Sequence, residues 1–371
     1  MLEYIYICRH GFRSNWVDPS IKTGPTGMNR DPPLAAYGTE QAGRLAAFLS
    51  DPQALDPHPV PERVFCSPFF RCIETAVPTY QALSGSKGSQ PSTSKAGNGI
   101  MLEHGVQEWY STVNPDTGLH PRPAGPEHLA PLFPPSSIDT SYTSTLFPSR
   151  RGETLKELQD RADLFIEAWT GRVEEMGVKS VVIFAHAASV IALGRALTGD
   201  KGLDISAGCA STSLYRRKSA AAAKSASSSG LIDAAASLAE KIGISTGPGA
   251  GSAASSASSE DHSGVGAWEA VFLGRADYLE NGVERDWSFK DAVIVDGEVI
   301  KDNGDRIPHP PEDQIPSGLS QGMEKYLRRG KPKPNTYIKE LDEAGSQVGG
   351  VDSVQGVARQ RKGSPRDAGK I

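Results

Sequence analysis

The sequence predicts an α/β fold, a three-layer sandwich in which helices cover both faces of a mostly parallel central sheet. Three short apolar segments, at residues 1–9, 63–66 and 179–185, have the composition of buried strands. A helical pattern follows each of these segments along the chain, up to about residue 200. This alternation favours a parallel sheet, because parallel neighbours need a crossover connection, which is usually a helix.

The first helix is expected after a loop at residues 17–38 that is rich in Pro, Gly, Asn and Asp. Thr39 is the expected N-cap, since apolar residues recur at helical spacing directly behind it. The second helix is expected to follow the strand at 63–66, and Pro78 should break or kink it.

The third helix has the clearest pattern of the chain and is expected within residues 152–177. Its apolar residues lie on one helical face: Leu155, Leu158, Ala162, Phe165, Ile166 and Trp169. The strand at 179–185 runs directly into a fourth helix, at whose start His186 stands. Residues 211–218 are expected to form a further strand.

Residues 1–218 are expected to form one core domain with two irregular segments. A Ser/Gly/Lys-rich stretch at 84–99 is expected to be a flexible insert. A longer stretch at 111–150 is dense in Pro, Ser and Thr. Because long structureless loops are uncommon in compact domains, we expect it to be a lid-like loop that governs the choice of substrate.

Residues 219–263 are rich in Ala, Ser and Gly and have little to bury, which is typical of a linker. Order is expected to return at 264–301, in a C-terminal β element that packs on the core domain. Two hairpin turns are predicted in this element, by Asn-Gly at 281–282 and by Asp-Gly at 296–297. Residues 302–371 are expected to be a disordered tail.

The composition of the 371-residue chain narrows its possible partners. The formal net charge of −5 predicts no direct binding to nucleic acid and no affinity for acidic membranes. No stretch reaches the roughly 18 apolar residues of a membrane span, and the first residues lack the basic start of a secretory signal. The sparse cysteines are expected to be buried free thiols of a reducing compartment, which is the cytoplasm, the nucleus or both: Cys8, Cys66, Cys72 and Cys209.

Basic and titratable residues stand where predicted strands end. Arg9 and His10 end the first strand and Arg13 follows them. Arg71 comes shortly after the second strand, and His186 follows the strand at 179–185 directly. Because the carboxyl ends of parallel strands meet at one edge of a sheet, we expect these side chains to share one rim.

Such a rim is suited to a phosphoryl group. Arg9, Arg13 and Arg71 offer planar guanidinium donors to its oxygens. His186 lies at a helix N-terminus, where free N–H groups and the helix dipole also favour an anion. His10 is the expected nucleophile, since a neutral imidazole can attack phosphorus through one nitrogen while the other donates to a fixed acceptor. No metal or cofactor is expected.

A carboxylic acid near this rim is expected to protonate the leaving group. Glu108 is the favoured proton donor, and Glu103 is the alternative. Gly11 is expected to let the backbone approach the phosphate closely.

The arginines also have ordinary structural explanations. Arg71 could pair with Glu74 within its own helix, and Arg13 could pair with Asp18 or Asp31. Either pairing would leave that arginine without a role at the rim.

Four segments occur in the order typical of the histidine phosphatase superfamily, also called phosphoglycerate-mutase-like: RHG after the first strand, SPFFRCIETA, GVQEW and FAHAASVIAL. The chain resembles this superfamily over roughly residues 1–218. The segments CRHGFRSNW and LAAYGTEQAGRLA are similar to a fungal branch, which includes the phosphatase-like subunit of the general initiation factor for RNA polymerase III.

This resemblance implies a phosphoglycerate-mutase-like sandwich and a role for each candidate residue. Arg9 and His10 match the RHG motif, and Arg13 matches the extra arginine of phosphatase members. Arg71 matches the arginine of the second motif. Glu108 matches the proton donor, and His186 matches the second histidine.

The expected function is a metal-independent phosphomonoester hydrolase, similar to the histidine acid phosphatases, that forms a phosphohistidine at His10. Its phosphorylated substrate is left open. The alternative is a catalytically weak or inactive phosphatase fold that serves as an interaction subunit, for example in an RNA polymerase III transcription factor complex, through the C-terminal β element and the tail. A mutase is disfavoured, because Phe12 and Arg13 follow RHG where mutases of the superfamily usually have Glu or a similar polar residue.

Overall fold

The computed structural model describes residues 1–85, 99–219, 264–292, 294–295, 298–299, 301, 303 and 315–327. These residues lie in one unit of the chain, Met1–Lys333, and the second unit, Pro334–Ile371, lies outside them. Most of the predicted insert and nearly all of the predicted linker also lie outside the described residues, as does the predicted tail apart from a few short segments.

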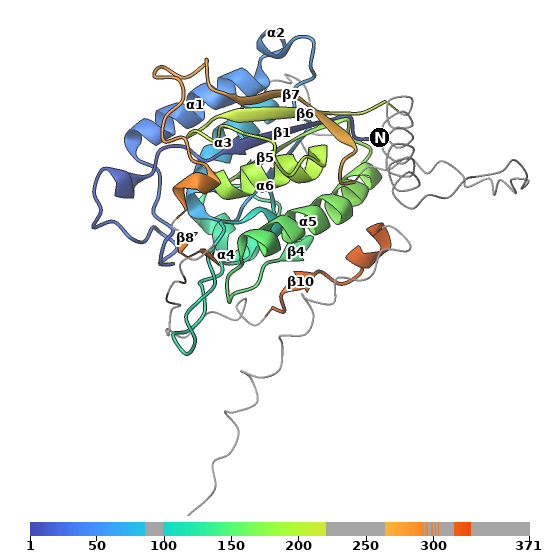
Figure 1. The fold of residues 1–371 in the computed structure, drawn as a ribbon. Coiled ribbons are helices and arrows are strands. Elements are labelled where there is room, and N and C mark those ends of the chain that lie inside the picture. The colour runs from blue at the N-terminus through green and yellow to red at the C-terminus, as the bar shows by residue number, and fades with distance from the viewer. Residues whose placement is uncertain are drawn as a thin grey trace, which may run out of the picture. The chain divides into compact units, whose positions relative to one another are not determined.

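In the described part of the chain, a six-stranded sheet has the strand order β3-β2-β5-β1-β6-β7 (Figure 1). Its strands are β1 Tyr4–Arg9, β2 Arg63–Cys66, β3 Met101–Leu102, β5 Ser180–Ala185, β6 Thr212–Arg217 and β7 Trp268–Arg275. β1, β2, β3 and β5 are parallel, β6 is antiparallel to β1, and β7 is antiparallel to β6. The predicted mostly parallel sheet is confirmed.

Helices cover both faces of this sheet (Figure 1). The α-helices in the described residues are α1 Ala36–Ser50, α2 Pro52–Leu55, α3 Phe70–Gly85, α4 Pro126–Leu129, α5 Leu155–Glu175 and α6 Ala187–Thr198. Ile5 and Ile7 of β1 belong to the apolar cluster that contains α5 and α6. Tyr6 and Cys8, which point to the other face, belong to the cluster that contains α1 and α3. The predicted three-layer sandwich is therefore confirmed.

α1 begins at Ala36, three residues before the predicted N-cap Thr39. The N-cap is Ala35, whose N–H donates to the carbonyl O of Phe12 at 2.9 Å. The prediction of Thr39 is wrong because this backbone contact with the loop after β1, and no capping side chain, sets the start of the helix. α3 continues through Pro78 without the predicted break.

α5 has the clearest local signal and forms where it is predicted. Thr154 is its N-cap, and Thr154 and Glu157 form a reciprocal capping box. The four cysteines are free and buried, as predicted. Among the described helices, none is long and apolar enough to cross a lipid bilayer.

The strands near the C-terminus match the predictions in part. β7 extends the sheet beside β6, and Trp268 at its start is fully buried. β8 Ile294–Val295 pairs antiparallel with β9 Glu298–Val299, as the predicted hairpin requires, while residues 296–297 themselves lie outside the described residues. The hairpin at 281–282 is wrong: the residues form a turn, but the described residues around it do not pair as strands. The chain after the turn bonds to α1 instead, through Glu284.

Residues 111–150 contain regular structure, although we expected an irregular lid-like loop. They include α4, the 3-10 turn Ala130–Leu132 and β4 Leu146–Phe147. β4 pairs antiparallel with β10 Gly318–Leu319, and a 3-10 helix at Met323–Tyr326 contacts α5. The prediction of a disordered tail is therefore wrong for residues 315–327, because backbone pairing orders a segment whose composition resembles a tail.

Candidate functional site

The carboxyl ends of β1 and β5 lie side by side at one edge of the sheet. Arg9 lies opposite Ala185 in the parallel register, so the residues that follow these two strands meet. The ring centroids of His10 and His186 are 5.4 Å apart, with an interplanar angle of 65°. The structure thus brings together two histidines that are far apart in the sequence.

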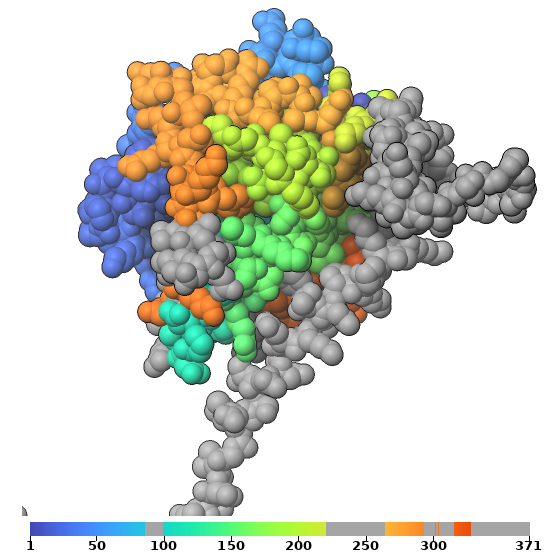
Figure 2. Space-filling view, viewed as in Figure 1, coloured from blue at the N-terminus to red at the C-terminus, as the bar shows by residue number. Residues whose placement is uncertain are grey.

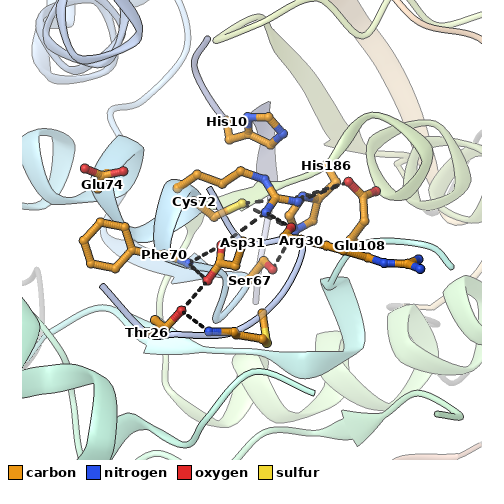
Figure 3. Close-up of polar contacts among 12 residues, drawn as sticks. His10, Thr26, Arg30, Asp31, Ser67, Phe70, Cys72, Glu74, Glu108 and His186 are labelled. Atoms are coloured by element: carbon orange, nitrogen blue, oxygen red, sulfur yellow. Dashed lines mark hydrogen bonds and ion pairs between the residues drawn. The ribbon is translucent and has the colours of Figure 1, made fainter. Parts of the chain in front are cut away.

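Arg71, in the first turn of α3, bonds to Asp31, Glu108 and His186. Figure 3 shows these three partners close together. Its side chain is 1% exposed. Nη1 donates to Oδ1 of Asp31 at 3.1 Å and to the carbonyl O of Arg30 at 3.2 Å. Nη2 donates to Oε2 of Glu108 at 3.2 Å and lies 3.1 Å from Nδ1 of His186. Burial opposes the charge of Arg71, but Asp31 and Glu108 outweigh it and raise the pKa of the guanidinium.

His186 is the N-cap of α6 and is fully buried. Because a guanidinium can only donate, Nδ1 of His186 accepts from Arg71, and the ring proton must lie on Nε2. Nε2 then donates to Oγ of Ser67, 2.8 Å away. Burial, together with the positive charge of Arg71, holds the pKa of His186 well below its ordinary value, so the ring is neutral near pH 7.

His10 is 1% exposed and has its own fixed tautomer. Nδ1 lies 2.7 Å from the carbonyl O of Gly11, which can only accept, so Nδ1 carries the proton. Burial, followed by Arg71 and Arg9, holds the pKa of His10 well below its ordinary value. A neutral ring with its proton on Nδ1 leaves the lone pair of Nε2 available, which is the state that a nucleophilic histidine needs.

Arg9 and Arg13 lie beside His10 and share the ring of Trp16. The Cζ atom of Arg13 is 4.2 Å from the Trp16 ring centroid and that of Arg9 is 5.7 Å from it. Arg9 also donates through Nη1 to the carbonyl O of Ala207. Burial, followed by the charge of Arg71, lowers the pKa of Arg13 to about 10, which still leaves it charged at neutral pH.

The Nε atoms of Arg9, Arg13 and Arg71 are buried and have no hydrogen-bond partner among the described residues. A buried donor without an acceptor costs about 1–3 kcal/mol, and more when it is charged. Three such donors around one imidazole favour a ligand with several acceptor oxygens and negative charge. A phosphoryl group has both properties.

The pairs Arg71–Glu74, Arg13–Asp18 and Arg13–Asp31, which would have given these arginines a purely structural role, do not form among the described residues. Glu74 accepts from the N–H of Leu34 at 2.7 Å, and Arg71 bonds to Asp31 and Glu108. Asp18 accepts from the hydroxyl of Ser20.

Glu108 and Glu103 lie in different environments. The side chain of Glu108 is 23% exposed, and its Oε2 lies 3.5 Å from Nδ1 of His186. Glu103 is fully buried and accepts from Tyr142 and from both the N–H and the hydroxyl of Thr145. Burial raises the pKa of Glu103 to about 7. The hydrogen bonds of Glu103 therefore anchor the chain that leads to β4, whereas Glu108 lies in the network of Arg71.

His10, Glu108 and His186 could in principle hold a metal ion, because one ligand atom from each lies within 4.8 Å of the others. Arg71, however, donates to both Glu108 and His186 and so occupies the lone pairs that a metal would need. Arg9 and Arg13 add positive charge next to His10. This donor set fits an anion better than a cation.

Ser67 and Asp31 also belong to the network of Arg71, although neither is among the residues predicted for the site. Ser67 follows β2 directly, so the rule that selected His10 and His186 at strand ends could have found it. Asp31 lies in a loop without periodicity, and the sequence suggests it only as a possible partner of Arg13. Besides Arg71, it accepts from the N–H of Phe70 at 3.0 Å and so fixes the start of α3.

Gly11 also allows a close approach between two backbone segments. A Cβ atom there would lie 2.7 Å from the carbonyl O of Gly38. A Cβ atom at Gly38 would lie 2.1 Å from the carbonyl O of Phe12. The two glycines therefore let the loop after β1 pack directly on α1, and this contact positions Arg13.

Residues 5–91 match the Histidine phosphatase superfamily (branch 1). The chain is 38% identical over 203 residues to the Transcription factor tau 55 kDa subunit of Saccharomyces cerevisiae, across 54% of this chain and 42% of that protein. It is 26% identical over 227 residues to the Ecdysteroid-phosphate phosphatase of Drosophila melanogaster, across 53% of this chain and 27% of that protein. The chain thus spans less than half the length of either relative.

A solved structure with a similar fold is that of the ecdysone phosphate phosphatase from Bombix mori in complex with tungstate. The comparison gives a TM-score of 0.42 and 18% identity, and it covers 58% of this chain and 89% of that chain.

Proposed function

This chain belongs to the histidine phosphatase superfamily, and we propose that it is a metal-independent phosphomonoester hydrolase that works through a phosphohistidine at His10. One observation carries the proposal. His10 is buried with its proton held on Nδ1 by the carbonyl O of Gly11, within a group of three arginines that have unsatisfied buried donors. This arrangement supports attack by Nε2 on an anionic phosphoryl group.

In the first step, Nε2 of His10 forms a bond to phosphorus, and the bond from phosphorus to the ester oxygen breaks. Arg9, Arg13 and Arg71 bind the phosphoryl oxygens, whose charge spreads in the transition state. The leaving oxygen takes a proton from Glu108. Arg71 already bonds to Glu108, so phosphate binding and the position of the acid are linked through one guanidinium.

In the second step, water attacks phosphorus and breaks its bond to Nε2 of His10. The water gives one proton to Glu108, which restores the acid, and inorganic phosphate leaves. His186 stays neutral and contributes its ring and the N-terminus of α6 to the anion site.

The test is hydrolysis of p-nitrophenyl phosphate in EDTA by the full chain, its His10→Ala variant and a His128→Ala control. His128 is an exposed histidine of α4. We expect activity in EDTA that falls about 10³-fold or more in His10→Ala and is unchanged in the control. Rapid quenching should also trap an acid-labile phosphoenzyme. Equal rates in wild type and His10→Ala, or no activity in either, would overturn the proposal.

A second function is favoured by the 38% identity to a transcription factor subunit. In this proposal the phosphatase domain of residues 1–218 serves a protein assembly in the nucleus. The C-terminal β element at 264–301 and the tail at 302–371 make the contacts. Affinity purification of the tagged chain from native extract tests this role, and recovery of the chain alone would count against it. A His10→Ala chain that still co-purifies with partners would separate assembly from catalysis.

A further inference from the structure

The segment after β7 contributes a residue to the site that the proposed mechanism does not use. In Figure 2, this segment lies beside the blue N-terminal part of the chain. The carbonyl O of Arg285 accepts a hydrogen bond from Nη1 of Arg9. Arg285 is therefore fixed next to the arginine that ends β1.

Arg285 completes a group of three guanidinium groups around the ring of Trp16. Its Cζ atom lies 5.2 Å from the ring centroid, alongside Arg13 at 4.2 Å and Arg9 at 5.7 Å. The ring of His10 lies 6.2 Å from the same indole, measured between centroids. Contact with an aromatic face stabilises an exposed cation by about 0.5–1 kcal/mol. This gain does not remove the repulsion among three positive charges.

The charges of the site leave Arg285 without an anionic partner. Arg71 is paired with Asp31 and Glu108. A bound phosphoryl dianion would match Arg9 and Arg13. Arg285 is exposed, its guanidinium contacts are with aromatic rings, and it forms no ion pair with another described residue.

The two acidic neighbours of Arg285 have other partners. Glu284 accepts from the hydroxyl of Tyr37 and from Nε2 of Gln41 at 3.0 Å. Asp286 accepts from the backbone N–H of Ala207 at 2.7 Å. Both carboxylates therefore hold the segment in place rather than neutralise Arg285.

The backbone of Arg285 has a left-handed conformation, with φ of 50°. A non-glycine residue pays about 1–2 kcal/mol for this conformation, which glycine adopts freely. The conformation lets one residue offer its carbonyl to Arg9 and its side chain to the face of Trp16. Backbone strain of this kind concentrates at binding sites, so it supports a role for the side chain.

We propose that Arg285 binds a second anionic group of the substrate, a phosphate or a carboxylate carried close to the phosphate that is hydrolysed. This inference rests on the proposed phosphomonoester hydrolase and names its substrate class, a phosphomonoester with a second negative charge. A planar guanidinium beside an aromatic face suits either group, because both accept two parallel hydrogen bonds.

The test is calorimetric binding of benzylphosphonate and of its 2-, 3- and 4-carboxy derivatives to the full chain, since phosphonates cannot be hydrolysed. We expect at least one carboxy isomer to bind about tenfold or more tightly than benzylphosphonate. Arg285→Gln should abolish this advantage and leave the affinity for benzylphosphonate within about twofold. A xylylene bisphosphonate in place of the carboxy derivatives shows whether phosphate or carboxylate is preferred.

Two control variants sharpen the result. Lys290→Gln removes an exposed positive charge from the same segment and should keep the advantage of the carboxy isomer. Arg285→Lys keeps the charge without the planar fork and should retain only part of it. If benzylphosphonate binds and Arg285→Gln changes nothing, the inference is overturned while the phosphate site stands. If wild type binds no phosphonate, the proposed function fails together with it.

Discussion

Nη2 of Arg71 and Nδ1 of His186 lie 3.1 Å apart, and this one contact fixes the protonation of the second histidine. The guanidinium must donate, so the imidazole accepts through Nδ1 and carries its proton on Nε2. The same nitrogen of Arg71 also reaches Glu108. Arg71 therefore contacts both His186 and Glu108. Its positive charge helps to keep His186 neutral, and its hydrogen bond holds the proposed acid beside the anion site.

Ser67→Ala tests this tautomer. The change removes the acceptor of the buried Nε2–H of His186, 2.8 Å away, and should lower the free energy of unfolding by about 1–3 kcal/mol. Ser20→Ala, at an exposed turn, is the control and should change it little. Two-bond proton–nitrogen correlation spectra of wild type should show His186 protonated on Nε2, and an Nδ1–H form would contradict the assignment.

Asp31→Asn should destabilise the fold strongly, because it removes one of two carboxylates that compensate a fully buried guanidinium. Breaking a buried ion pair from one side costs about 3–5 kcal/mol. Urea unfolding measures the effect, and Asp18→Asn is the matched control, since Asp18 is an exposed carboxylate bonded to Ser20. A loss no larger than that of the control would mean that Asp31 does not support Arg71.

Comparing Glu108→Gln with Glu103→Gln should show which glutamate is the proton donor and which one has only a structural role. Glu108→Gln removes the proposed acid and should lower kcat for phenyl phosphate by about 10²–10⁴-fold. The loss should be smaller for p-nitrophenyl phosphate, whose leaving group needs no proton. Glu103→Gln should leave both rates near those of wild type. A selective loss for phenyl phosphate in Glu103→Gln would reverse the assignment of the acid.

Glu103 should also make stability depend on pH. Its pKa is raised by burial from 4.5 to about 7, so the folded state binds more protons than the unfolded state between these values. The free energy of unfolding should therefore fall as pH rises from about 4.5 to about 7, by about 3 kcal/mol for this group. Urea unfolding at pH 4.5, 6 and 8 should show wild type losing stability relative to Glu103→Gln over this range. A difference that stays constant with pH would exclude ionisation of Glu103.

Much of the fold could be predicted because its signals are local. The apolar face of α5 and the apolar strand before His186 each lie within one continuous segment of the chain, so the sequence pattern finds them. The rule that ligands bind at the carboxyl ends of parallel strands then brings His10 and His186 to one rim. This prediction requires only that the two strands are parallel and lie close together in the sheet; it does not depend on which residues pair.

The features that the sequence did not predict depend on contacts between distant segments. The start of α1 is set by a backbone bond from Ala35 to Phe12, which no local propensity encodes. Asp31 accepts a hydrogen bond from Arg71, which is 40 residues away in the sequence, and it lies in a loop without periodicity. Residues 318–319 form a strand because β4 offers an unpaired edge, and composition alone does not reveal an edge.

The contact between the loop after β1 and α1 leads to the last prediction. Gly38→Ala would place a Cβ atom 2.1 Å from the carbonyl O of Phe12, and the obstacle is backbone that cannot rotate away. The helix or the loop must move, so Arg13 should shift and both stability and phosphonate affinity should fall. Gly43→Ala is a matched control in the same helix, where nothing lies within 4 Å of the added atom. The control should be neutral or stabilise the helix by up to about 1 kcal/mol, because alanine is the better helix former.

Thermal unfolding and calorimetric titration with benzylphosphonate measure both effects in one pair of proteins. Retention of wild-type affinity in a folded Gly38→Ala chain would show that the position of Arg13 does not depend on this contact. If Gly38→Ala and Gly43→Ala lost affinity for benzylphosphonate equally, the loss would come from a change in α1 as a whole. The close approach of α1 to the loop after β1 would then not contribute separately to the site. The expected result is a loss confined to Gly38→Ala, since only that glycine meets the carbonyl of Phe12, the residue that immediately precedes Arg13.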